Sequence, residues 1–119
     1  MKILIADDSR VMRQIVLRTM RQAGFGHHDF VEATDGADAL DKVAAESPDL
    51  VLSDWNMLNK TGIELLRALR GSGSTVPFGF VTSEGSEEMR QTAQEAGAMF
   101  LIAKPFTPES FSDALSGVL

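Results

Sequence analysis

The chain has 119 residues, 44% of them hydrophobic, and a formal net charge of −6. This length fits one domain, which we expect to span residues 1–119, and the composition is ordinary for a globular protein with one core. No apolar run approaches the roughly 20 residues of a membrane-spanning helix, and the apolar start is too short for a secretory signal. The lack of cysteine excludes disulfides and thiolate metal sites. We therefore expect a cytoplasmic protein without membrane insertion.

The acidic balance argues against direct binding of nucleic acid, which requires a basic face toward the phosphates. Four arginines do cluster early in the chain, at Arg10, Arg13, Arg18 and Arg21. Helical spacing predicts that they spread along a solvated helix face instead of forming a phosphate-binding patch. We therefore expect no direct contact with nucleic acid.

Short apolar runs alternate along the chain with longer segments of helical periodicity, which predicts five strand–helix units. Capping residues, glycines and prolines mark where the elements begin and end. In chain order we predict a strand over 2–6, a helix between Ser9 and Gly24, a strand over 30–34, a helix between Gly36 and Ser47, a strand over 49–53, a helix over 62–70, a strand over 76–81, a helix over 86–96, a strand over 100–103 and a last helix capped by Thr107.

This alternation predicts an α/β fold, in which a parallel sheet is covered by helices on both faces. Right-handed crossovers reduce the topologies to a few doubly wound arrangements. Residues 50–52 are apolar without alternation and predict the central strand, whereas Glu32 places the second strand near an edge. For the second helix, the spacing predicts an apolar side made of Ala37, Leu40, Val43 and Ala44.

Polar residues gather where four of the predicted strands end, namely Asp7 and Asp8, Asp54, Thr82, and Lys104. In doubly wound sheets, ligands bind outside the carboxyl ends of the strands. Taken singly, Asp7, Asp8, Thr82 and Lys104 are more easily explained as turn, cap or surface residues, whereas Asp54 fits a loop residue and a site residue equally well. Together, however, three carboxylates at one edge would repel one another, and a divalent cation relieves that repulsion directly.

The residue types at this edge favour Mg²⁺, which prefers carboxylate oxygens, water and phosphate as ligands. A carboxylate can attack phosphorus and form an aspartyl phosphate. We expect Asp54 to be this nucleophile and Asp7 and Asp8 to hold the metal. Lys104 would supply the counter-charge and Thr82 a hydroxyl for the transferring group. His27 and His28 lie on a distant predicted loop and are expected to be surface residues.

The segments 5–9, 52–57, 81–84 and 103–106 carry these polar residues. In order and content they resemble the signature motifs of response-regulator receiver domains, and the resemblance covers essentially the whole chain. The stretch Ser-Asp-Trp-Asn-Met at 53–57 is most similar to the single-domain chemotaxis receivers.

The resemblance implies a flavodoxin-like sheet with strand order 2-1-3-4-5. It implies that Asp8, Asp54 and the backbone carbonyl of Asn56 bind Mg²⁺ directly, while Asp7 assists through water. It also implies phosphoryl transfer from a sensor histidine kinase, and output to a downstream protein through the fourth helix, fifth strand and fifth helix. We expect a role in chemotaxis; the alternative is a stand-alone phosphorelay intermediate or a receiver unconnected to chemotaxis. Such a protein is not an enzyme with a separate substrate, because it catalyses only its own phosphorylation and dephosphorylation.

Three positions depart from the family pattern. Leu58 stands where proline is usual, Thr61 where an acidic residue is frequent, and Leu101 where an aromatic residue is usual. The first two concern the rigidity of the loop after Asp54, and the third concerns the aromatic switch. By the same resemblance, Asn56 and Glu84 favour rapid self-dephosphorylation.

Three other classes of protein share parts of this pattern. A flavin-binding protein needs a Ser/Thr/Gly-rich phosphate loop after the first strand, where Asp7 and Asp8 would repel a bare phosphate. A metal-dependent phosphatase usually needs a cap over its substrate, and 119 residues leave no room for one. A receiver-like module that binds partners without phosphorylation would have no need of the intact set of acids.

Overall fold

The computed structural model describes residues 1–83 and 85–118. Within them, five strands alternate with five helices as the sequence predicts. The elements are β1 (Lys2–Ala6), α1 (Arg10–Gln22), β2 (Asp29–Ala33), α2 (Gly36–Glu46), β3 (Leu50–Ser53), α3 (Gly62–Gly71), β4 (Phe78–Thr82), α4 (Glu87–Ala96), β5 (Phe100–Ala103) and α5 (Pro108–Leu115).

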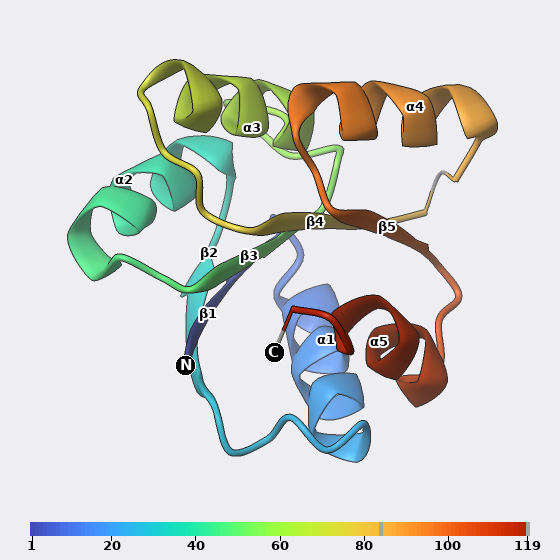
Figure 1. The fold of residues 1–119 in the computed structure, drawn as a ribbon. Coiled ribbons are helices and arrows are strands. Elements are labelled where there is room, and N and C mark those ends of the chain that lie inside the picture. The colour runs from blue at the N-terminus through green and yellow to red at the C-terminus, as the bar shows by residue number, and fades with distance from the viewer. Residues whose placement is uncertain (84, 119) are drawn as a thin grey trace.

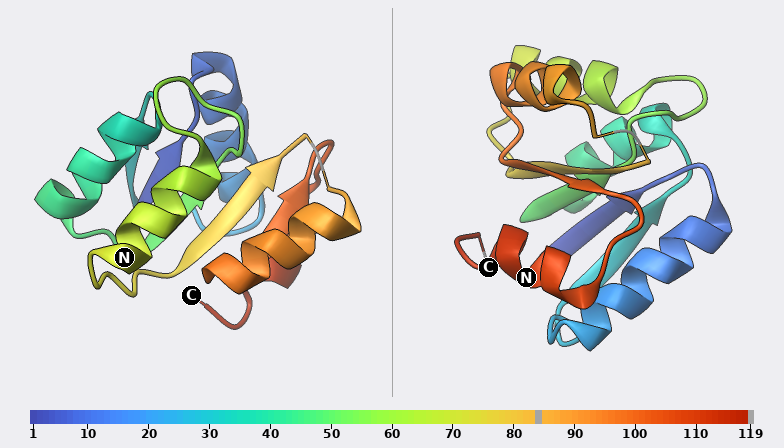
Figure 2. Two further views of the ribbon diagram at one scale, coloured as in Figure 1. Left: turned by 90° about the horizontal axis from the view of Figure 1, so that it is seen from above. Right: turned by 90° about the vertical axis from the view of Figure 1, so that its right-hand side faces the viewer.

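The strands form one parallel sheet in the order β2-β1-β3-β4-β5. Helices α1 and α5 cover one face of this sheet, and α2, α3 and α4 cover the other (Figures 1 and 2). A separate cluster of buried apolar side chains lies under each layer of helices. The predicted doubly wound, flavodoxin-like fold with strand order 2-1-3-4-5 is therefore confirmed.

The positions of the strands follow from their sequences. All four residues of β3 are buried, as expected for a central strand without hydrophobic alternation. In contrast, β2 lies at the edge of the sheet and only its last residue, Ala33, is buried. The edge position leaves Glu32 half-buried. Both predictions about strand placement are confirmed.

Several details differ from the sequence-based predictions. The fourth strand begins at Phe78 instead of residue 76, because Pro77 precedes it and has no N–H to give to a ladder. The apolar side predicted for α2 is wrong at Ala37 and Ala44, which are exposed, whereas Ala39 is fully buried. Alanine is small enough to occupy either face, so its spacing is a weak guide to burial.

The ends of α3 and α4 meet through one side chain. Arg70, in the last turn of α3, donates from Nη1 to the carbonyl oxygen of Ser74 over 3.1 Å. Its Nη2 donates over 3.0 Å to the carbonyl oxygen of Gly97, the C-cap of α4. This arginine therefore links the C-terminal ends of two adjacent helices.

In the part of the chain that the structure describes, no helix combines the length and the apolar character that crossing a membrane would require.

Candidate functional site

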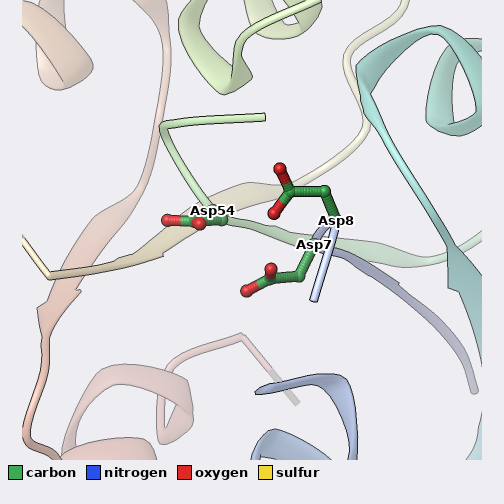
Figure 3. Close-up of side chains that lie close together, drawn as sticks. All are labelled: Asp7, Asp8 and Asp54. Carbon is green, nitrogen blue, oxygen red and sulfur yellow. The ribbon is translucent and has the colours of Figure 1, made fainter. Parts of the chain in front are cut away.

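Three carboxylates meet at the carboxyl ends of β1 and β3. The two strands pair in parallel with Ala6 opposite Ser53, and the amide of Asp54 donates to the carbonyl oxygen of Ala6 over 2.9 Å. The next residues, Asp7 and Asp8 on one strand and Asp54 on the other, are therefore adjacent (Figure 3). One carboxylate oxygen from each lies within 4.8 Å of the other two. The sequence-based prediction that these acids converge is correct in its geometry.

The three acids differ in how far they are exposed. Asp7 is buried, with 4% of its surface accessible, and the side chain of Asp54 is 13% exposed. Asp8 is exposed to solvent. The site, called the acidic recess below, therefore has two inner acids, Asp7 and Asp54, and one acid, Asp8, that is exposed to water.

Lys104 brings a positive charge to this recess from the end of β5. Its Nζ lies 3.7 Å from Oδ2 of Asp7 and 3.8 Å from Oδ1 of Asp54, and its side chain is 17% exposed. The amide of Lys104 donates to the carbonyl oxygen of Thr82 over 2.8 Å. Thr82 is itself fully buried at the last position of β4. Four separate strand ends therefore contribute to one edge of the sheet.

Burial sets the protonation behaviour of the two inner acids. Desolvation raises the pKa of Asp54 above its ordinary value; Lys104 and the amide of Trp55 oppose the rise, while Asp7 and Asp8 add to it. Desolvation likewise raises the pKa of Asp7, against the opposing effects of the Ser9 amide and Lys104. One lysine is not enough to offset three crowded acids, so the recess favours an additional cation.

Residues 3–116 match the family model of the response regulator receiver domain. The chain belongs to the response regulator receiver domains. It is 37% identical over 122 residues to the chemotaxis protein CheY homolog of Campylobacter jejuni subsp. jejuni, an alignment that covers all of this chain and 92% of the relative.

Solved structures give the same result for this receiver. The chemotaxis protein CheY4 of Vibrio cholerae is 36% identical with a TM-score of 0.85, and the match covers 99% of this chain and 98% of that one. The receiver domain of the Francisella response regulator 1452 is 26% identical with a TM-score of 0.87, over 98% and 94% of the two chains. This is a receiver of the CheY type, a class that interacts with histidine kinases and downstream targets.

Receiver domains generally bind Mg²⁺, and the donor set of this receiver fits that ion. Among the described residues, one group of side chains lies close enough together to hold a metal ion, and it consists of Asp7, Asp8 and Asp54. All three offer carboxylate oxygens, which are hard ligands. The rings of His27 and His28 contact each other at a tilt of 40° in the segment before β2, and neither residue is in this group. Asn56 is exposed two residues after Asp54, and its part in metal binding stays a prediction.

Asp54 of this receiver is fixed from two sides. Oδ1 of Asp54 accepts a hydrogen bond from the amide of Trp55 over 2.8 Å. Behind it, α3 begins at Gly62, where a Cβ atom would overlap the carbonyl oxygen of Asp54 and press on the ring of Phe80. Glycine is therefore required at this position, because only its backbone can approach Asp54 so closely.

The two departures in the loop after Asp54 are both compensated. Leu58 is exposed, but its neighbour Asn59 donates from Nδ2 to Oδ2 of Asp35 over 2.6 Å and ties the loop to the start of α2. Thr61 caps α3: its hydroxyl accepts from the amide of Glu64, whose carboxylate accepts from the amide of Thr61. The loop is therefore held without the usual proline and acidic residue.

Arg13 corrects one sequence-based prediction. It does not lie on a solvated face; it is only 8% exposed, and its guanidinium contacts Glu32 and the backbone of Asp7. The helical spacing of the sequence could have indicated this burial, because Arg13 lies on the same helix face as the buried residues Val16, Leu17 and Met20. Glu84, the other polar residue expected near the site, lies outside the described residues.

Proposed function

We propose that this receiver accepts a phosphoryl group on Asp54 from the phosphohistidine of a sensor histidine kinase, in a Mg²⁺-dependent reaction. The observation that supports it most is the acidic recess itself, where three carboxylates lie within 4.8 Å of one another and Lys104 lies 3.8 Å from Asp54. A recess of this composition repels anions by itself and accepts a phosphoryl group only together with a cation.

In this proposal the residues of the recess have separate roles. A bond forms between a carboxylate oxygen of Asp54 and phosphorus while the bond from phosphorus to the donor nitrogen breaks. Asp8, Asp54 and the carbonyl of Asn56 would hold Mg²⁺ and Asp7 would assist through water. The ion would neutralise charge on the transferring phosphoryl oxygens. Lys104 would pair with one of these oxygens and the hydroxyl of Thr82 would hydrogen-bond another.

Asp54 is favoured over the other two acids as the nucleophile. Asp7 is already engaged, because its Oδ1 accepts from the amide of Ser9 and its Oδ2 faces Lys104. Asp8 is exposed at the rim. Asp54 directly follows the central strand, lies 3.8 Å from Lys104 and has its backbone anchored to β1.

We further propose that the protein catalyses only its own phosphorylation and dephosphorylation and acts on a downstream protein through α4, β5 and α5. A chemotaxis pathway is supported by the names of its relatives. Leu101, which replaces the aromatic residue of the usual switch, favours the alternative of a phosphorelay intermediate, since a relay needs little conformational output. The cytoplasmic location stays a prediction.

The decisive experiment is incubation with Mg²⁺ and a small acyl-phosphate donor, followed by intact-mass analysis. The wild-type protein should gain one labile phosphoryl group, and Asp54→Asn should gain none. Asp41→Asn is the matched control, since Asp41 is an exposed acid on α2, and it should behave as the wild type. An acyl phosphate that persists on Asp7 or Asp8 in Asp54→Asn would contradict the assignment of the nucleophile.

A further inference from the structure

We propose that Arg13 is a positioning residue for the acidic recess, which orients the peptide unit between Asp7 and Asp8 and so prepares their carboxylates for a divalent cation. This inference rests on the metal site proposed above. It concerns a side chain that does not touch the ion or the phosphoryl group.

Two contacts support this role. Nη1 of Arg13 donates to the carbonyl oxygen of Asp7 over 2.7 Å, in a buried hydrogen bond. Nε of the same guanidinium donates to Oε1 of Glu32 over 2.9 Å. The arginine therefore spans from α1 to the edge strand β2 and holds the end of β1 between them.

The hydrogen bond from Arg13 to the carbonyl oxygen of Asp7 is important because of where that carbonyl lies. The carbonyl of Asp7 belongs to the peptide bond that joins the two acids, and that unit is planar. Fixing its oxygen therefore fixes the direction in which the chain enters Asp8. Upstream, the amide of Asp7 donates to the carbonyl oxygen of Ala33 over 3.1 Å, and the Asp7 carboxylate accepts from the amide of Ser9. Arg13 adds the contact that determines the orientation of the Asp7–Asp8 unit.

The contribution of Arg13 is geometric and not a matter of net charge. Its guanidinium is paired with the carboxylate of Glu32 over 2.9 Å, and within the Asp7–Asp8 unit it contacts the backbone carbonyl oxygen of Asp7. A planar guanidinium presents donors in fixed directions and can serve two acceptors at once. A lysine keeps the charge but lacks this fixed fork, so it should not replace Arg13.

The test measures Mg²⁺ affinity by the fluorescence of Trp55, the only tryptophan, and by calorimetry, next to urea unfolding without metal. Residues that orient metal ligands typically change affinity by about tenfold or more when replaced. We expect Arg13→Met and Arg13→Lys to weaken Mg²⁺ binding by about tenfold. Glu32→Gln, which keeps an oxygen to accept from Nε, should weaken it less.

Val16→Ala is the matched control. Val16 is buried one turn further along α1, and its side chain has no polar atom that could hold the Asp7–Asp8 peptide unit. It should lower the free energy of unfolding but leave Mg²⁺ affinity unchanged. Equal affinities in the wild type and both Arg13 variants, or an equal loss in Val16→Ala, would overturn the role of Arg13 while leaving the metal site intact. Absence of saturable binding by the wild type in both measurements would overturn the metal site and this inference with it.

Discussion

Helices α3 and α4 lie side by side on the same face of the sheet, yet they are anchored very differently (Figure 1). Helix α4 has one buried residue, Ala93, along its ten positions. An open hollow of about 290 Å³ lies between α4 and β5. Helix α3 has the same length but buries five residues: Gly62, Ile63, Leu65, Leu66 and Leu69.

The difference corresponds to the residues that precede each helix. Helix α3 follows Asp54 and begins against its backbone at Gly62, so Asp54 packs directly against the start of this helix. Helix α4 follows Thr82, the hydroxyl expected to move toward a bound phosphoryl group. Elements with few buried apolar contacts shift at low cost in free energy. The fold therefore anchors α3 firmly next to Asp54 and anchors α4 with fewer buried side chains.

The largest expected effect is on stability and tests how firmly α3 and α4 are anchored to the core. Leu66→Ala removes a fully buried side chain of α3 and should lower the free energy of unfolding by about 3 kcal/mol. Ala93→Gly, at the one buried position of α4, should cost only about 1 kcal/mol. Urea unfolding followed by circular dichroism measures both. A loss in Ala93→Gly well above the propensity cost of glycine in a helix would show that α4 is as firmly anchored as α3.

A second prediction concerns the acids beside α3. Because the pKa of Asp54 is raised in the folded protein, the native state binds its proton more tightly than the unfolded chain. Stability therefore falls as pH rises from the unfolded value of about 3.9 through the folded one. Without divalent cation, Asp54→Asn should raise the free energy of unfolding at pH 7 by about 1 kcal/mol, a typical single-substitution effect.

This gain should disappear at about pH 3, below the unfolded pKa of aspartate, where the acid is neutral in both states. Mg²⁺ should stabilise the wild type more than the variant, since a ligand stabilises the state that binds it. Unfolding curves at both pH values, with and without Mg²⁺, provide the measurement. A gain of equal size at both pH values would mean that charge crowding is not its cause.

The smallest expected effect concerns the α4 side. Leu101 is half-buried and packs against the core cluster under α3 and α4. A leucine has no polar tip to hold it outward, so we expect it to occupy the same position with and without phosphate. Leu101→Tyr should therefore strengthen the coupling between phosphorylation and partner binding by about fivefold.

The ratio of partner affinities with and without a phosphoryl mimic measures this coupling in both proteins. Phe100→Tyr is a useful comparison, because Phe100 is the neighbouring position on β5 and belongs to the other face. Equal ratios in the wild type and Leu101→Tyr would show that Leu101 does not limit the switch.

The sequence predicted the fold and most of the recess because both depend on short-range patterns. Apolar runs identify the strands, parallel strands end at one edge, and the polar residues at those ends must meet. Arg13 was misplaced because a charged residue is usually assigned to solvent, and its partner Glu32 is distant in sequence. The hydrogen bond that holds the loop after Asp54 was also not predicted, since Asn59 and Asp35 lie 24 positions apart in the sequence.

The link from Arg70 to Gly97 has a mechanical consequence for α4. It attaches the C-terminal end of that helix to α3, whereas the N-terminal end, capped by Ser86, is exposed. Along the helix, the contact of Arg90 with the carbonyl oxygen of Leu101 is an exposed hydrogen bond over 3.1 Å. A reorientation of α4 that keeps the Arg70–Gly97 contact is a rotation about its C-terminal end. Over ten residues, or about 15 Å, such a rotation gives its largest displacement at the N-terminal end, the end that follows Thr82 in the chain.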